Sequence, residues 1–115
     1  MTSIIFKVCD QEAWSSAKQE GRYTGAPIDL ADGYIHFSTA SQLAETLAKH
    51  FAGRQDLVLV AVHTADLGPG LRWEPSRGGD LFPHLYEDLT MAHVAWEAPL
   101  PLEDGRHVLS DLERT

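Results

Sequence analysis

Cysteine and basic residues are both scarce in this sequence of 115 residues. The single cysteine, Cys9, cannot form an intramolecular disulfide or a cysteine-rich zinc site, which favours a reducing cytoplasm. Nine Lys and Arg against 17 Asp and Glu give a net charge of −8. This balance argues against a broad basic face, so we expect no extensive nucleic-acid binding.

Long apolar runs are also absent. No stretch approaches the roughly 20 apolar residues that a membrane helix needs, and the apolar run at the N-terminus is too short for a signal peptide. The composition, with 43% hydrophobic and 23% charged residues, is that of a globular protein. We therefore expect one soluble cytoplasmic domain over residues 1–115, with no membrane partner.

Several common catalytic motifs are missing from the sequence. It contains no GxGxxG, GxxxxGK[ST], HExxH or GxSxG pattern, so the dinucleotide fold, P-loop, zincin and α/β-hydrolase interpretations lose their main support. Its six histidines show no HxH or HxxxH spacing. Because zinc ligands usually occur in close pairs, we predict no metal site.

Strand and helix patterns alternate in the first half of the chain, and strands follow. The run LVLVAV at 57–62 is apolar at every position, which predicts a central strand covered on both faces. Thr39 and Gln42 form a capping-box pair at the start of the clearest helix. The expected elements are strands at 3–8, 33–37, 57–62, 91–98 and 106–109, extended segments at 71–74 and 82–86, helices at 11–20 and 39–53, and loops at 22–32 and 75–80. This order predicts an α+β fold with a mixed or mostly antiparallel sheet and two helices near the N-terminus.

A first group of candidate site residues ends the strand at 33–37. Tyr34, His36 and Ser38 share one face of an extended chain, while the apolar residues between them face the core. Ser38 and Thr39 also precede a helix N-terminus, where an anion such as phosphate is favoured. The alternative is structural: His36 hydrogen-bonds backbone, and Ser38 and Thr39 only cap the helix.

A second group lies between positions 73 and 86, around the paired glycines of the predicted loop. If the end of this segment is extended, Phe82, His84 and Tyr86 share a face and offer a stacking ring, an imidazole and a phenol. Trp73 and Glu74 lie nearby in the sequence. The alternative is a small satellite core around a Gly-rich turn.

Two further positions invite a chemical interpretation. His93 and Glu97 could pair on one face of their strand, although a solvated strand face explains both residues equally well. Cys9 could be a nucleophile at a helix N-terminus, or a small buried side chain.

The segments DGYIHFSTASQ (32–42) and LRWEPSRGGDLFPHLY (71–86), with the opening strand IFKV, resemble a bacterial family of unknown function known by the number nine-five-two. The resemblance covers nearly the whole chain. It implies an ADP-ribosyltransferase-like fold, with a split, curved sheet whose cleft holds NAD in the active relatives.

The resemblance also implies roles for particular residues. His36 is similar to the residue that contacts the ribose of NAD in those transferases, and Ser38 and Thr39 would flank the same cleft. His84 and Tyr86 would line it, with Trp73 and Glu74 nearby. Glu74 and Glu97 compete for the role of the catalytic glutamate. If the chain is such a transferase, Phe82 or Tyr86 would stack on nicotinamide, and Arg22, Arg72 or Arg77 would meet phosphate.

These observations leave three hypotheses open. The first is an ADP-ribosyl or related NAD-dependent transferase, with NAD as substrate, His36 and Glu74 as catalytic residues, and Tyr34 among the binding residues. The second is a non-catalytic module that binds a nucleotide or another small molecule in the same cleft. The third is a homodimeric interaction protein.

Overall fold

The computed structural model describes residues 3–109, without the side chain of Arg77. The longer elements are β1 (Ile4–Asp10), α1 (Gln11–Glu20), α2 (Pro27–Asp32), α3 (Ala40–His50), β4 (Leu57–His63), β5 (Leu71–Pro75), β6 (Leu81–Leu85) and β8 (Val94–Leu100). The short strands are β2 (Arg22–Tyr23), β3 (Ile35–His36), β7 (Leu89–Thr90), β9 (Leu102–Glu103) and β10 (Arg106–His107). Three 3₁₀ turns complete the described part, at Thr64–Asp66, Arg77–Gly79 and Met91–His93.

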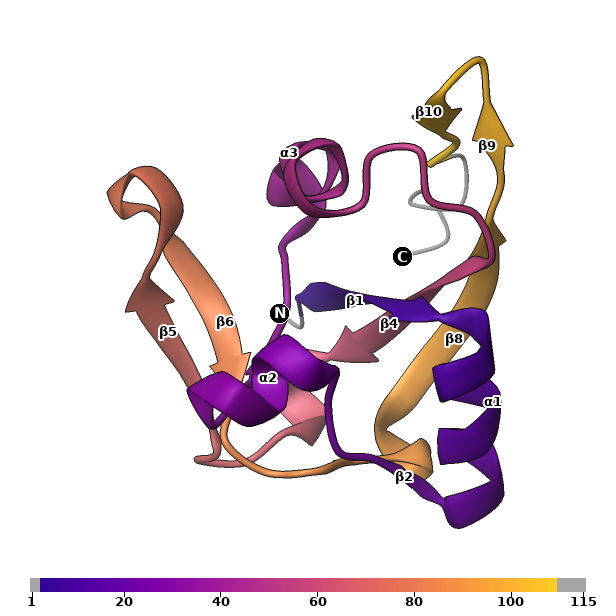
Figure 1. Ribbon diagram of the computed structural model, residues 1–115. Helices are drawn as coiled ribbons and strands as arrows, with labels where there is room; N and C mark the ends of the chain where they lie inside the picture. The colour runs from indigo at the N-terminus through magenta and orange to yellow at the C-terminus, as the bar shows by residue number, and fades with distance from the viewer. Residues whose placement is uncertain (1–2, 110–115) are drawn as a thin grey trace.

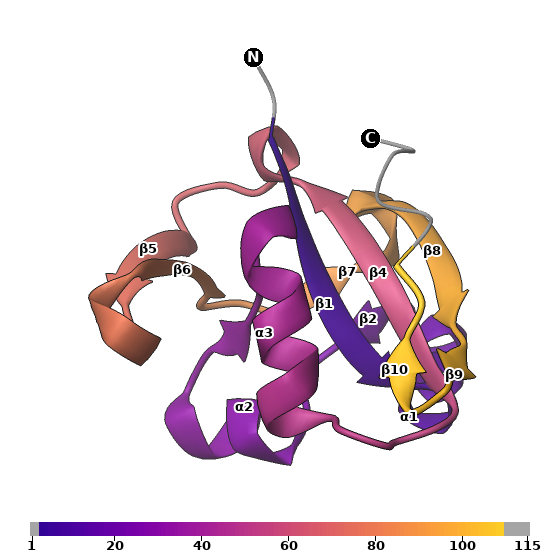
Figure 2. The ribbon, with the colours of Figure 1, turned by 90° about the horizontal axis from the view of Figure 1, so that it is seen from above.

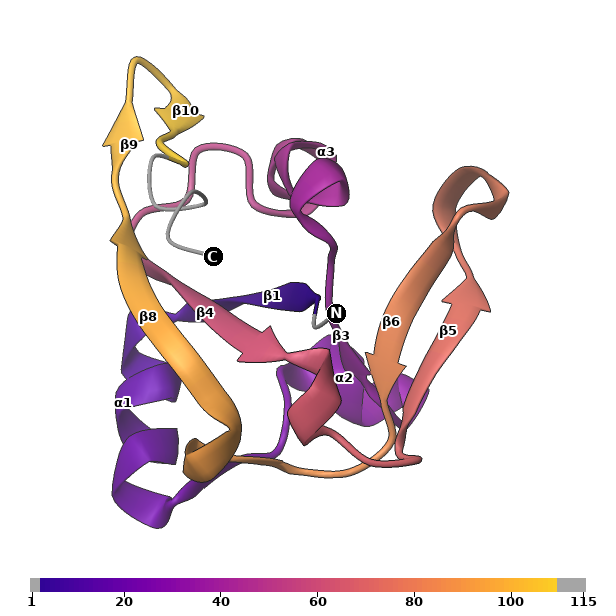
Figure 3. The ribbon, with the colours of Figure 1, turned by 180° about the vertical axis from the view of Figure 1, so that it is seen from behind.

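Two three-stranded antiparallel sheets form the framework, with strand orders β1-β4-β8 and β3-β6-β5. Figures 1 and 3 show the β5–β6 hairpin standing apart from the β1-β4-β8 sheet. The two sheets meet where Phe6 and Ser38 exchange backbone hydrogen bonds, each with an N–O distance of 2.8 Å. The predicted α+β class with mostly antiparallel strands is therefore confirmed.

β4 is the central strand of its sheet, as its apolar sequence predicts, and every residue from Leu57 to Val62 is buried. Helices cover both faces. Trp14 of α1 packs with Val60 on one face, and Leu43 of α3 packs with Leu59 on the other. Figure 2 shows α3 lying alongside β1. Burial on both faces explains why the polar and apolar alternation of a half-exposed strand is missing.

The predicted loop at 22–32 is wrong in part, because it contains β2 and the helix α2. Pro27 begins α2, and its fixed φ suits the first turn of a helix. Gly33 ends the helix in the left-handed conformation, with φ 88°. The helix has only six residues, too short for its apolar periodicity to stand out in the sequence.

Three predicted strands differ from the structure. The strand at 33–37 pairs only through Ile35–His36, although the chain continues to the bridge at Ser38. The predicted strand at 91–98 begins with a 3₁₀ turn and becomes β8 at Val94. The strand predicted at 106–109 is reduced to β10, paired with β9 across a tight turn. Within residues 3–109, no helix is long and apolar enough to cross a membrane.

Candidate functional site

The β3-β6-β5 sheet has one apolar and one polar face. Ile35, Leu85 and Leu71 are aligned across the three strands and pack against the main core. The next row of the register aligns His36, His84 and Arg72, which therefore share the opposite face. Two histidines far apart in the sequence are thus direct neighbours.

Four rings gather on the polar face, and we call Tyr34, His36, His84 and Tyr86 the ring cluster. The ring centroid of Tyr34 lies 4.1 Å from that of His84, 4.6 Å from His36 and 5.1 Å from Tyr86. The two imidazole centroids are 5.4 Å apart. These spacings fall within or just below the range of favourable aromatic pairs, so the rings form one packed group.

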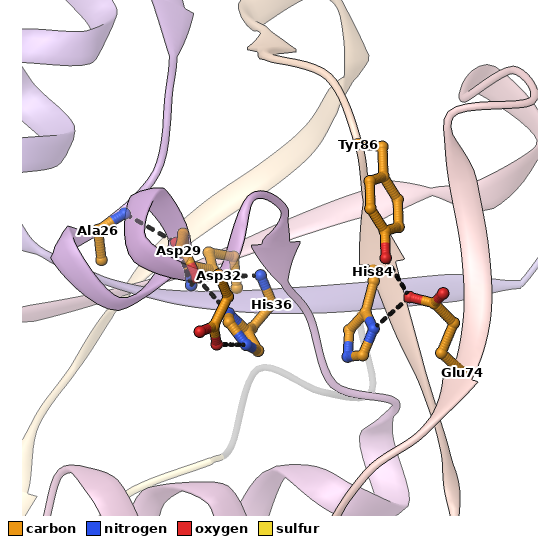
Figure 4. A network of polar contacts seen from close by, with 8 residues as sticks. Ala26, Asp29, Asp32, His36, Glu74, His84 and Tyr86 are labelled. Carbon is orange, nitrogen blue, oxygen red and sulfur yellow. Dashed lines mark hydrogen bonds and ion pairs between the residues drawn. The ribbon is translucent and has the colours of Figure 1, made fainter.

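Glu74, which lies on the neighbouring strand β5, binds two members of the ring cluster. Its Oε1 lies 2.8 Å from Nδ1 of His84 and accepts a 2.7 Å hydrogen bond from the Tyr86 hydroxyl (Figure 4). The hydrogen bonds from Tyr86 and His84 lower the pKa of Glu74, and the same contact raises the pKa of Tyr86. Glu74 is therefore a carboxylate that stays ionised beside the rings.

Asp29 of α2 binds His36 from the buried side. Its Oδ1 lies 2.6 Å from Nδ1 of His36 and accepts the backbone N–H of the same residue at 3.1 Å. Its Oδ2 lies 2.9 Å from Nζ of Lys7, which is buried on β1. Burial alone would raise the pKa of Asp29, but the His36 hydrogen bond and the Lys7 charge outweigh it, and the pKa falls to about 2.

The second nitrogen of His36 faces another carboxylate of α2. Nε2 of His36 lies 3.0 Å from Oδ2 of Asp32, whose side chain is 41% exposed. An imidazole can donate hydrogen bonds from both nitrogens only when it is protonated. The ring of His36 therefore lies between two carboxylates, one at each nitrogen, as Figure 4 shows.

A cation completes the polar face. The guanidinium carbon of Arg72 lies 4.7 Å from the centre of the Tyr86 ring, within the range of a cation–π contact.

Burial and the carboxylates of Asp32 and Glu74 raise the pKa of the remaining phenol, Tyr34. The phenols of Tyr34 and Tyr86 therefore stay neutral well above neutral pH.

Other predicted site residues lie at the far end of the same face, where α3 approaches. Ser38 is buried, and its Oγ lies 2.9 Å from Oγ1 of Thr46. Thr39 is the N-cap of α3, and its backbone N–H donates to Oε1 of Gln42 at 3.0 Å. The capping role predicted for Thr39 is confirmed, whereas the ring of His36 binds carboxylates rather than backbone.

A hollow of about 430 Å³ opens between the start of α3 and the start of β6. It is lined by Thr39, Ser41, Gln42, Glu45, Asp80, Leu81 and Phe82. Phe82 is itself buried and shares the polar face with His84. β6 therefore runs from the hollow to the ring cluster.

Trp73 is not brought to the ring cluster. It pairs with Pro83 in the register, which places both side chains on the face opposite to His84, and it remains 43% exposed. Neither a satellite core nor a site on the polar face therefore includes Trp73.

The other candidates lie away from this site. Glu97 of β8 accepts hydrogen bonds from Nε1 of Trp14 at 2.8 Å and from Lys18 at 2.9 Å, so these residues, and not His93, are its partners. His93 lies in a 3₁₀ turn that breaks the strand alternation. Cys9 is buried, as the alternative of a small buried side chain predicts. Burial raises the pKa of its thiol to about 12.

The arginines expected to contact phosphate lie in different parts of the structure. Arg72 lies at the ring cluster, whereas Arg22 forms a 3.6 Å ion pair with Asp88. The side chain of Arg77 lies outside the described part of the chain. Among the described residues, no group of three His, Cys, Asp or Glu side chains is arranged to hold a metal ion.

Sequence reasoning missed Lys7, Asp29 and Asp32, although signals for them exist. Lys7 is a charged residue on the face of β1 that carries Ile5 and Cys9, so it requires a buried partner. The carboxylates follow Pro27 and precede Gly33, a pattern that marks a short helix.

The chain is similar to known proteins over almost its whole length. Residues 8–97 match the profile of a family described as a protein of unknown function, DUF952. The crystal structure of protein CC0527 from Caulobacter crescentus is 47% identical, with a TM-score of 0.91 over 95% of this chain and 96% of that chain. The solution structure of CC0527 is 46% identical, with a TM-score of 0.81 over 90% of each chain. No curated protein matches the chain. Because the profile match extends over most of the sequence, the chain belongs to the DUF952 family of proteins of unknown function.

Proposed function

We propose that this chain binds a nucleotide of the NAD class at the ring cluster. One observation carries the proposal: two cross-strand histidines, each held by a carboxylate, share one sheet face with two phenol rings and an arginine. Rings recognise a base by stacking, and guanidinium and imidazolium groups recognise phosphate by charge-assisted hydrogen bonds.

The polar face offers one region for ligand binding at each end of β6, which suits an elongated ligand. Tyr34 and Tyr86 offer stacking surfaces at one end of β6, and the hollow at Phe82 lies at the other end. Tyr86 lies four residue steps along the extended chain from Phe82, which corresponds to about 13 Å. A dinucleotide carries a base at each end and charged phosphates between them, and Arg72 and His36 lie between these two regions.

Glu74 suits the chemistry of ADP-ribosyl transfer. In that reaction the bond between nicotinamide and ribose C1′ breaks, an acceptor oxygen or nitrogen bonds to C1′, and the acceptor loses its proton to a base. The ribose develops positive charge, which a carboxylate with a lowered pKa stabilises by remaining ionised. Of the two competing glutamates, only Glu74 lies at the ring cluster, so we assign it this role.

The same proposal includes an ADP-ribosyltransferase-like classification of the fold. Its support is the pair of three-stranded sheets joined at Phe6 and Ser38, with the ring cluster on the smaller sheet. A split sheet is the feature that the sequence resemblance leads us to expect of such a fold.

Thermal unfolding with NAD, ADP-ribose and adenosine tests the binding part. A ligand at 100 times its dissociation constant adds about 2.7 kcal/mol, which raises Tm by on the order of 10 °C in a domain of this size. Arg72→Ala and His36→Ala should reduce the shift caused by NAD. Arg22→Ala is the matched control, because it removes an arginine whose ion pair lies elsewhere, and it should preserve the shift.

Nicotinamide release tests the transfer part. Glu74→Gln should keep NAD binding and lose release, because the amide preserves the shape of the side chain and removes its charge. Binding without release in the wild-type protein, with an acceptor mixture present, would reject the transferase and keep the nucleotide-binding module. No Tm shift with any of the three ligands would reject both.

A further inference from the structure

The two carboxylates that flank His36 differ sharply in how firmly they are held. Asp29 has a side chain that is 1% exposed, and it accepts hydrogen bonds from Lys7, from the Ala26 backbone and from His36. Asp32 is 41% exposed, and its contact with Nε2 of His36 is an ion pair at the protein surface. Asp29 is therefore a fixed partner, whereas Asp32 can move into solvent at little cost.

Asp32 also stands at an electrostatically unfavourable place in its helix. It is the last residue of α2, directly before the left-handed Gly33. The unpaired carbonyl groups at a helix C-terminus repel a carboxylate and favour a cation. The contact with His36 is the interaction in the structure that compensates this position.

Charges around His36 leave its outer nitrogen suited to an anion. Lys7 and Asp29 neutralise each other on the buried side, and on the outer side Nε2 of His36 has Asp32 as its partner. Neighbouring groups on the polar face are Arg72, His84 and Glu74, and Glu74 is turned towards His84 and Tyr86. When Asp32 leaves, the outer nitrogen of His36 can donate a charge-assisted hydrogen bond to another negatively charged acceptor.

We propose that Asp32 occupies the position of the ligand's phosphate on Nε2 of His36 and must be displaced before that phosphate binds. The inference rests on the proposed nucleotide site and adds two things to it. It names His36 Nε2 as the atom that donates a hydrogen bond to the phosphate, and it identifies Asp32 as an internal competitor that weakens binding of anionic ligands.

The test is a comparison of Asp32→Ala with the wild-type protein, using inorganic pyrophosphate, ADP-ribose and adenosine as probes in calorimetric titrations. Alanine favours a helix more than aspartate does, so the variant should stay folded. Removing an exposed competing carboxylate should tighten pyrophosphate and ADP-ribose binding by about three- to fivefold. Adenosine, which has no phosphate, should bind both proteins equally.

A matched control separates this effect from general charge. Glu20→Ala makes the same change in net charge at the exposed end of α1, and it should leave all three affinities unchanged. The imidazole NMR signal of His36 gives a second readout. Pyrophosphate should shift the Nε2 resonance in Asp32→Ala at lower concentration than in the wild-type protein.

The outcomes distinguish this inference from the proposed function. Tighter pyrophosphate binding in Asp32→Ala, with no binding of ADP-ribose, supports the inference and rejects the nucleotide assignment. Equal ADP-ribose affinity in both proteins rejects the inference and keeps the nucleotide site. Weaker anion binding in Asp32→Ala also rejects the inference, and absence of all binding in both proteins rejects the two proposals together.

Discussion

His36 on β3 and His84 on β6 are direct cross-strand partners whose ring centroids are 5.4 Å apart. A carboxylate from outside this strand pair holds each ring: Asp29 of α2 binds His36, and Glu74 of β5 binds His84. The site therefore depends on the docking of α2 and β5 against the same two strands. Its stability and its chemistry can be tested separately.

We expect Asp29→Asn to destabilise the fold strongly. Loss of the carboxylate leaves the buried ammonium of Lys7 without a counter-charge, and removing one partner of a buried ion pair costs about 3–5 kcal/mol. Asp32→Asn is the matched control, because it alters the exposed carboxylate on the other nitrogen of His36 and should cost less than about 1 kcal/mol. Urea unfolding measures both. Equal costs for the two variants would show that the buried pair is not the stabilising contact.

Asp29 should also make the free energy of unfolding depend on pH. The pKa of Asp29 is lowered from 3.8 to about 2 on folding, so its contribution is complete above the unfolded value and is lost as the pH falls towards the folded one. The free energy of unfolding should therefore decrease from about pH 5 downwards, by on the order of 2 kcal/mol for this group. Asp29→Asn should show a shallower decrease. An identical slope in both proteins would contradict the assignment.

We expect Cys9 to resist thiol reagents in the folded protein. Its side chain is buried, and burial raises its pKa from 9.0 to about 12, so little thiolate forms at neutral or mildly alkaline pH. Labelling should be slow in buffer and fast in urea, with a rate that follows the unfolding equilibrium. Fast labelling of the native protein at pH 8 would instead indicate an accessible, activated thiol.

All three tyrosines should ionise above their ordinary pKa of 10.0. Burial raises the pKa of Tyr23 and of Tyr34, and the hydrogen bond to Glu74 raises that of Tyr86. An ultraviolet titration should therefore show no phenol with an ordinary pKa in the native protein. Glu74→Gln should move one ionisation back towards 10, because Tyr86 then donates to a neutral amide. If the titration curve does not change, the Tyr86–Glu74 hydrogen bond is absent in solution.

Local patterns in the sequence predict the elements whose signals are strong. The uniform apolar run of β4 and the Thr39 capping box of α3 give the right strand and the right helix start. The helix α2 was missed because its six residues are too few to display a helical period, and its apolar side chains Ile28 and Leu30 are exposed. β3 is short because its pairing with β6 ends after His36. β6 is distant in the sequence, so the local pattern around β3 does not show where the pairing ends.

The site could be predicted only in part, for a related reason. Alternation along a strand places Tyr34 with His36, and His84 with Tyr86, on shared faces. It does not set the register between β3 and β6, which makes His36 and His84 neighbours, nor the position of β5, which selects Glu74 over Glu97. Partners from other elements, above all Asp29, depend on tertiary packing and have no local signature.

The most direct test of the nucleotide site is an NMR titration of the imidazole signals with ADP-ribose. Because His36 and His84 are adjacent in one ring cluster, both signals should shift along the same binding curve, with one dissociation constant. His107, whose Nε2 contacts the Arg54 backbone carbonyl, is the internal control and should not respond. Shifts of neither His36 nor His84 at saturating ADP-ribose, or shifts of His107 alone, would contradict the account.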